Sequence, residues 1–236
     1  MECEAGLQEL TMLCGQAVIA IWNGIAEGGR AEFYAWHVIE HMPERLSIPG
    51  FLRGRRYRAV DGGTHPEFFT LYELQSFEVA SSQDYLDRLN APTPWTKKAT
   101  AAFRDTSRGL ARVLMSTGPG PGGALTTLRF AVASGQELAA QSGLSDVMRD
   151  IARLPMVTGA HLALADADAS GVKTAESKGR QDIQSPPGWF VLIEACTADA
   201  LEEPIRRVTG SNLVSRPDVG RYVHEYSRLK TDGSVG

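Results

Sequence analysis

The chain has 236 residues, of which 43% are hydrophobic and 22% are charged, and its net charge is −4. This composition is ordinary for a globular protein with a buried core, and the lack of a basic excess argues against nucleic acid as a partner. Cys3, Cys14 and Cys196 are odd in number and widely spaced, which predicts free thiols in a reducing compartment and therefore a cytoplasmic protein.

The sequence gives no sign of secretion or membrane insertion. Its N-terminal stretch contains Glu2 and Glu4 and has no positively charged region before an apolar run. No apolar stretch approaches the roughly 18 residues that a membrane-spanning helix needs. We therefore expect no membrane partner, and we interpret residues 1–15, which lack clear periodicity, as a leader.

Residues 16–117 predict the order strand, helix, strand, strand, helix, strand. β-branched and aromatic residues mark the first strand, and apolar residues at about 100° per residue mark the first helix. Ile48-Pro49-Gly50 stops that helix, and Asp61-Gly62-Gly63 turns the chain between the next two strands. The predicted elements are strand 16–25, helix 30–45, strands 51–60 and 67–74, helical segments 77–89 and 95–103, and strand 109–116.

The same order follows residues 118–123, GPGPGG, which we interpret as a linker because alternating Gly and Pro fit neither a helix nor a sheet interior. Its elements are strand 124–133, helix 135–153, strands 157–165 and 188–196, helix 198–208 and strand 219–229. Aligning the two copies places Glu73 against Glu194. Residues 166–187 form a long polar loop, which we expect to be a surface excursion.

This repeated order is the ferredoxin-like order, whose helices leave one face of each sheet uncovered. Two such sheets cover those faces by packing together. The predicted fold class is therefore α+β, with two tandem ferredoxin-like βαββαβ units at 16–117 and 124–230 that form an intramolecular dimeric α/β-barrel. Residues 231–236 are a predicted tail. The outer sheet edges could pair with another copy of the chain, so a homo-oligomer is possible.

The stretch 36–57 resembles the EthD-like proteins of the dimeric α/β-barrel superfamily. Their signature is a helix ending in Glu-His-x-Pro, followed by Pro-Gly-Phe, and the matching residues here are Glu40, His41 and Pro43, then Pro49, Gly50 and Phe51. The resemblance implies two sheets closed into a barrel, with a cavity between sheet and helix. The superfamily includes cofactor-free monooxygenases, decarboxylases, cyclases, isomerases, haem proteins and members of no known activity, so the fold alone does not select a reaction.

His41 is the leading candidate for a catalytic residue. At 100° per residue it lies at the edge of the helix's apolar arc, where a neutral imidazole could take or give a proton near pH 7. The alternative is a boundary histidine that fixes the helix end. His37 lies further round the helix, so we expect it at the surface or an interface, with substrate binding as its alternative role.

The strands supply further candidates. Tyr72 and Glu73 lie on opposite faces of the third strand, and either could exchange protons with His41. The recurrence of a glutamate at Glu194 favours a structural role for Glu73, such as accepting from a backbone or Arg donor. Arg55 and Tyr57 share a face of the second strand and could bind an anionic substrate, although the sequence leaves open which face is inner.

The remaining candidates concern the cavity walls and any bound group. Trp36 and Trp95 are expected to line the cavity, with Trp95 as a lid. Residues 37–41 also spell the H-x-x-E-H motif of some zinc proteases, but Pro43 should end the regular helix at once, so we expect no metal. Tandem haem proteins of the superfamily carry a second-half helical histidine, which helices 135–153 and 198–208 lack, so no cofactor is expected.

Together these features predict a small-molecule enzyme that uses acid–base chemistry without a cofactor on a small aromatic or acyl substrate in the first-unit cavity. Lyase, isomerase or cyclase, and oxygenase reactions all stay open. The alternative is a non-catalytic small-ligand-binding or assembly protein of the same fold, in which His41 only fixes the helix end.

Overall fold

The computed structural model describes residues 13–178, 180–184 and 188–230. Cys3, the predicted tail and most of the predicted leader therefore lie outside the described residues. The first half contains β1 (Ala17–Ile25), α1 (Arg30–Trp36), η1 (His37–His41), α2 (Met42–Ser47), β2 (Phe51–Ala59), β3 (Phe68–Leu74), η2 (Phe77–Ser81), α3 (Gln83–Asn90), α4 (Pro94–Thr100) and β4 (Phe103–Thr117). The second half contains β5 (Ala124–Phe130), α5 (Glu137–Ile151), β6 (Val157–Ala165), α6 (Ala167–Ser170), β7 (Ile183–Gln184), β8 (Trp189–Ala195), η3 (Asp199–Leu201), α7 (Glu202–Thr209) and β9 (Asp218–Leu229).

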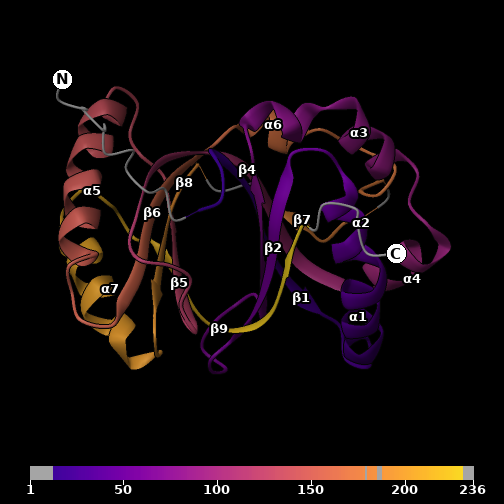
Figure 1. Ribbon diagram of the computed structural model, residues 1–236, viewed down its shortest axis with the longest axis horizontal. Coiled ribbons are helices and arrows are strands. Elements are labelled where there is room, and N and C mark those ends of the chain that lie inside the picture. Colours follow the sequence, from indigo (N-terminus) through magenta and orange to yellow (C-terminus); the bar gives the residue numbers. More distant parts are fainter. Residues whose placement is uncertain (1–12, 179, 185–187, 231–236) are drawn as a thin grey trace, which may run out of the picture.

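Eight strands of the described chain close into a barrel with helices on two opposite sides (Figure 1). The order around the barrel is β1-β3-β2-β9-β5-β8-β6-β4, and β4 pairs back with β1. The helices α1 to α4 cover one side, and α5 and α7 cover the other (Figure 1). The predicted α+β barrel is confirmed at this level. No helix within the described ranges is long and apolar enough to cross a membrane.

Each strand presents alternate side chains to the barrel interior and to the helices. The interior is filled by an apolar cluster that includes Trp22, Phe69 and Phe190. Outside the barrel, α5 and α7 pack on the second-half strands through a continuous apolar core. The first-half helices pack on their strands through two separate apolar clusters. The candidate site lies on this first-half helical side.

The fourth strand is longer than its sequence predicts. Residue Phe103 was expected in a helix, but it begins β4 and pairs with Ile25 of β1. It also packs edge-on against Phe33 of α1, with ring centroids 5.7 Å apart. The strand runs on to Thr117 because its first part pairs with β1 and its second part with β6. Pairing with two neighbours thus overrides the local helical pattern.

The first helix continues past Pro43 to Ser47, two residues beyond its predicted end, and Pro43 does not end its regular part. The helical path runs unbroken from Arg30 to Ser47, and its middle turn, η1, is π-helical. The backbone N–H of Met42 donates to the carbonyl of His37, a bond that spans five residues. A proline cannot donate a backbone hydrogen bond and crowds the carbonyl four residues before it, and the wider turn tolerates both defects.

The described residues of the long polar loop lie at the surface as expected, but over the first half of the barrel. We call residues 166–178 and 180–184 the strap, because this segment crosses to the first-half side of the barrel, away from α5 and α7 (Figure 1). The backbone N–H of Glu176 donates to the carbonyl of Leu89 at 3.0 Å, and that of Thr106 donates to the carbonyl of Asp182 at 2.8 Å. The strap therefore forms part of the first-half helical layer.

Candidate functional site

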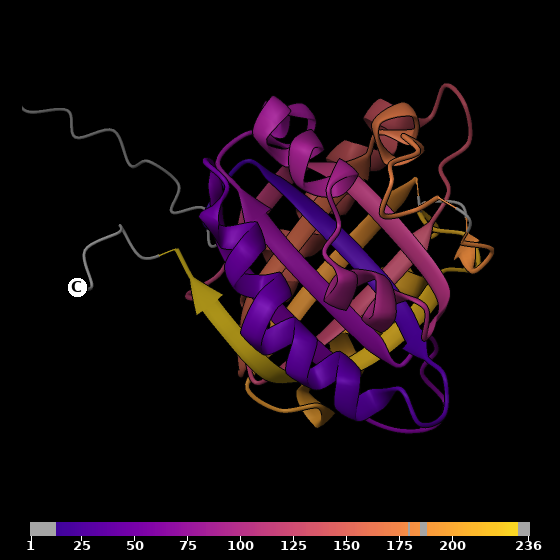
Figure 2. The same ribbon diagram turned by 90° about the vertical axis from the view of Figure 1, so that its right-hand side faces the viewer.

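A cavity of about 70 Å³ lies between the first-half helices and the outer faces of β1, β3 and β4. The continuous helix α1-η1-α2 covers this side of the sheet and runs in about the same direction as the strands behind it (Figure 2). Its η1 turn and the strands supply polar side chains to a space that is otherwise walled by aromatic rings. The polar lining includes Asn23, His37, His41, Arg45, Thr70, Tyr72 and Arg108.

His41 and Tyr72 face each other in this cavity. His41 is buried and stacks on Trp36 with ring centroids 4.2 Å apart, while the ring of Tyr72 lies 6.2 Å away. The Nδ1 atom of His41 and the Oη atom of Tyr72 are both buried, and neither has a hydrogen-bond partner among the described residues. Buried polar atoms are nearly always satisfied, so this pair indicates a place for a bound molecule or water.

His37 is buried beside His41 and not at the surface as expected. The guanidinium of Arg56 lies 3.3 Å from its Nδ1 atom and pairs with the carboxylate of Glu225 on β9. His37 lies four residues before His41, and side chains four residues apart lie on the same face of a helix. The prediction was wrong because the buried face of this helix extends beyond the apolar arc and includes His37.

Burial keeps both histidines neutral. Desolvation, followed by the nearby charges of Arg56 and Arg45, lowers the pKa of His37 to about 3. Desolvation, then Arg45 and His37, lowers the pKa of His41 well below its ordinary value. Burial also raises the pKa of Tyr72. At neutral pH the cavity thus presents an imidazole that can accept a proton and a phenol that can donate a hydrogen bond.

Replacing Tyr72 with Phe is expected to leave the free energy of unfolding unchanged or to raise it by about 1 kcal/mol, because the substitution removes a buried hydroxyl that has no partner. Urea unfolding measures the difference. As a matched control, Tyr222→Phe removes a hydroxyl that donates to the carbonyl of Pro66 at 3.1 Å and should cost about 1 kcal/mol. A comparable loss from Tyr72→Phe would show that its hydroxyl is satisfied in the folded chain.

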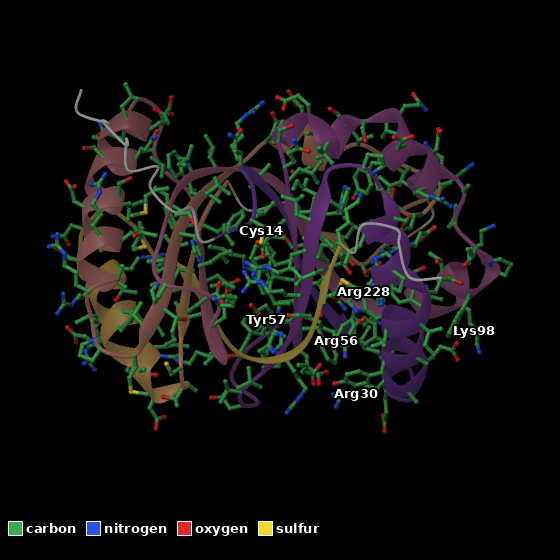
Figure 3. The ribbon with its side chains drawn as sticks, in the orientation of Figure 1. Cys14, Arg30, Arg56, Tyr57, Lys98 and Arg228 are labelled. Carbon is green, nitrogen blue, oxygen red and sulfur yellow. The ribbon has the colours of Figure 1, made fainter. Side chains whose placement is uncertain are left out.

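The structure does not bring Glu73, Arg55 or Tyr57 to His41. All three point into the barrel, and Figure 3 shows Tyr57 there, with Arg56 on the helix side of the same strand. Arg55 forms ion pairs with Glu73 at 2.9 Å and with Glu194 at 2.7 Å. Glu73 also accepts from the backbone N–H of Cys14, so it has both a backbone and an Arg donor. The sequence left open which face of β2 lines the barrel interior, and it is the face that carries Arg55 and Tyr57.

The two tryptophans have different places. Trp36 lines the cavity and donates through its indole N–H to Thr96 at 3.1 Å. Trp95 does not line the cavity; its indole N–H donates to Glu32 at 2.6 Å and ties α4 to α1. It is therefore not the lid. The strap covers the cavity instead, with Glu176 and Arg180 in the wall and with Glu176 paired to Arg45. No local pattern in the long loop indicated these two residues.

The residues of the second half do not fit a haem. Buried apolar side chains that include Leu144, Met148 and Ile193 form a continuous core between α5, α7 and their strands. Neither helix contains a histidine. The cavity beside His41, at about 70 Å³, is far smaller than a porphyrin. For metals, the described residues contain no group of three or more His, Cys, Asp or Glu side chains that could hold an ion.

No family model matches the sequence, and no curated protein matches it significantly. Solved structures do match. An anthrone oxidase-like protein superposes with a TM-score of 0.60 and 10% identity, covering 94% of this chain and 96% of that one. A protein from Lactobacillus acidophilus NCFM with a provisional monooxygenase name gives 0.57 and 13% identity, covering 91% and 97%. A mutant chlorite dismutase from Candidatus Nitrospira defluvii gives 0.50 and 8% identity, covering 89% and 90%.

These neighbours and the closed eight-stranded barrel establish the dimeric α/β-barrel fold for this chain. This is the fold that the resemblance through Glu40-His41-x-Pro43 implies.

Proposed function

We propose that this chain is a small-molecule enzyme whose active site is the cavity between α1-η1-α2 and the first-half strands. The observation that carries the proposal is the pair of buried, unpartnered polar atoms, His41 Nδ1 and Tyr72 Oη, on opposite walls of one cavity. A chain that needed only a stable core would lose nothing by filling this space with apolar side chains.

The second half supports this reasoning, because its equivalent face is apolar. Glu73 pairs with Val18 and Glu194 with Leu125, so the strand registers relate the two halves position by position. Four polar positions of the first-half cavity wall correspond to apolar residues in the second half. The pairs are Asn23 and Phe130, Thr70 and Val191, Tyr72 and Ile193, and Arg108 and Val219.

In the proposed chemistry, Nδ1 of His41 accepts a proton from an acidic C–H or O–H bond of the substrate. The electron pair of that bond stays on the substrate as an enolate or phenolate, and the hydroxyl of Tyr72 donates a hydrogen bond to its oxygen. Attraction between the imidazolium and the substrate anion offsets part of the cost of burying both charges. Neither step needs a cofactor.

The fate of the anion separates the reaction types. Reprotonation by His41 at another atom gives an isomerase reaction. Attack of the anion on a carbonyl carbon of the same substrate forms a ring and an alkoxide, which takes the proton from His41, and this is a cyclase reaction. Transfer of electrons from the anion to dioxygen oxidises the substrate and reduces dioxygen, which is oxygenase or oxidase chemistry. The names of the neighbours, an anthrone oxidase-like protein and a provisional monooxygenase, support dioxygen as the co-substrate.

The proposal is tested on carbon acids. With pentane-2,4-dione in deuterated buffer under nitrogen, the protein should accelerate deuterium incorporation measured by proton NMR. Replacing His41 with Gln should slow this exchange at least about 100-fold. His224→Gln is the matched control, because His224 lies on β9 outside the cavity and contacts Ser227. Oxygen uptake in air then reports whether the anion reacts with dioxygen.

Equal exchange rates for the wild type and His41→Gln, or no acceleration by the wild type, would contradict acid–base catalysis. That outcome would favour the alternative of a non-catalytic ligand-binding or assembly protein, in which His41 stacks on Trp36 and fixes the helix.

The organisation of the chain is part of the proposal. We interpret residues 16–117 and 124–230 as two diverged copies of one ferredoxin-like unit, since each half has the same strand order, β4-β1-β3-β2 and β9-β5-β8-β6. Only the first copy would then carry the site. We also propose a cytoplasmic protein with a small molecule as its ligand, without nucleic-acid or membrane partners, and able to form a homo-oligomer through its outer surfaces.

A further inference from the structure

Arg108 is an unusual arginine of the cavity wall. Its guanidinium has two contacts, both with Tyr85: it donates to the hydroxyl at 2.7 Å, and it lies 5.7 Å from the ring centroid. Within the described ranges, no carboxylate lies at ion-pair distance from it. The other two arginines of the wall do have carboxylate partners: Arg45 pairs with Glu176, and Arg180 pairs with Asp182.

A half-buried guanidinium without a counter-ion is costly, because burial removes part of its hydration without supplying an opposite charge. Tyr85 holds the group in place but cannot neutralise it. Arg108 shares the cavity with the unpartnered His41 Nδ1 and Tyr72 Oη atoms. The cavity thus combines one unneutralised cation with two unsatisfied polar atoms, which suits a ligand with an anionic end and a reactive polar end.

A second hollow, of about 750 Å³, lies outside this cavity between α4 and the strap. The two spaces share three wall residues, Phe103, Glu176 and Arg180. The hollow is also lined by basic side chains, among them Lys97, Arg104 and Lys178. Asp105, Glu176 and Asp182 line it as well. Because Asp182 pairs with Arg180 and Glu176 with Arg45, the hollow keeps a small positive excess, which favours the approach of an anion.

We propose that Arg108 binds the carboxylate of a small planar substrate, which arrives through the outer hollow and passes between Phe103 and the strap. This inference rests on the proposed function and names its substrate class. A cavity of about 70 Å³ has room for about five to seven water-sized groups, which is enough for a short unsaturated acid. A single guanidinium suits a carboxylate, which it can bind through two parallel hydrogen bonds.

Crotonate and its neutral isostere crotonamide test the proposal, since they have the same shape and differ in charge. Isothermal titration of the full chain should show at least tenfold tighter binding of crotonate. Arg108→Gln should abolish this preference, because it removes the positive charge that distinguishes the two probes. The matched control is Arg112→Gln on the same strand, because Arg112 is exposed, pairs with Glu78 and should keep the full preference.

Arg108→Lys covers the case in which Arg108→Gln does not fold. It keeps the charge but loses the two parallel hydrogen bonds, so its preference for crotonate should be weaker than that of the wild type. Equal binding of the two probes by the wild type, binding of neither, or a full preference in Arg108→Gln or Arg108→Lys would overturn the proposal.

The result is independent of catalysis. Loss of carbon-acid exchange in His41→Gln together with no crotonate preference in the wild type would leave the proposed function standing and remove the carboxylate subsite. The reverse combination would support the subsite as part of a binding protein.

Discussion

Replacing Arg55 with Met is expected to lower the free energy of unfolding by about 3–5 kcal/mol. Arg55 is fully buried inside the barrel and lies between the carboxylates of Glu73 and Glu194. Its removal leaves two buried negative charges with less compensation, although Glu73 keeps Arg53 and Glu194 keeps the backbone N–H of Gly122. Urea unfolding at pH 7 measures the loss.

Arg58→Met is the matched control for this substitution. Arg58 lies on the same strand, but its side chain is about half exposed and pairs with Glu225 at 3.1 Å, so the loss should stay below about 1 kcal/mol. Equal effects of the two substitutions would show that the charges inside the barrel do not hold the two sheets together as the structure indicates.

Stability should fall as the pH drops below the ordinary pKa of histidine, 6.5. Folding lowers the pKa of His37 to about 3 and that of His41 well below its ordinary value, so the unfolded chain binds more protons than the folded chain in this range. Stability is therefore fully present above pH 6.5 and is lost as the pH falls toward the folded pKa. The loss is about 1.4 kcal/mol per pH unit for each histidine, or about 2 kcal/mol for His37 alone at pH 5.

Urea unfolding at pH 7, 6 and 5 measures this slope. Glu194, whose pKa is lowered mainly by Arg55, loses its stabilising effect only below the ordinary glutamate pKa of 4.5 and does not contribute above pH 5. Burial raises the pKa of Glu44, which therefore opposes the histidine slope at the acid end of this range. His224 has a lowered pKa too and contributes to the slope. The double variant His37→Asn, His41→Gln should flatten most of it. A wild-type stability that does not change between pH 7 and 5 would mean that the two histidines are hydrated.

Hydrophobic periodicity predicted the elements well where a strand or helix has one buried face. The strand 157–165 has the predicted bounds, and β9 begins one residue before its prediction. The failures have tertiary causes. Phe103 joins β4 because β1 pairs with it, and Pro43 stays inside a helix because the π turn of η1 absorbs it. Neither effect can be predicted from the local pattern of apolar residues.

The candidate site was predictable in part. A strand period of two correctly separated Tyr72 from Glu73, and the helix motif singled out His41. The same period could not show which face of β2 is inner, so Arg55 and Tyr57 were chosen although Arg56 is the residue that reaches the helix. Glu176 could not be predicted as a site residue, because a long loop has no periodicity and its path across the barrel depends on tertiary contacts.

A crystal structure of the chain with crotonate tests the central claim, that the cavity between α1-η1-α2 and the first-half strands is the ligand site. We predict crotonate density in this cavity, with the carboxylate on Arg108 and the other end beside His41 and Tyr72. Density only inside the barrel near Arg55, or only between α5, α7 and the second-half strands, would contradict the account.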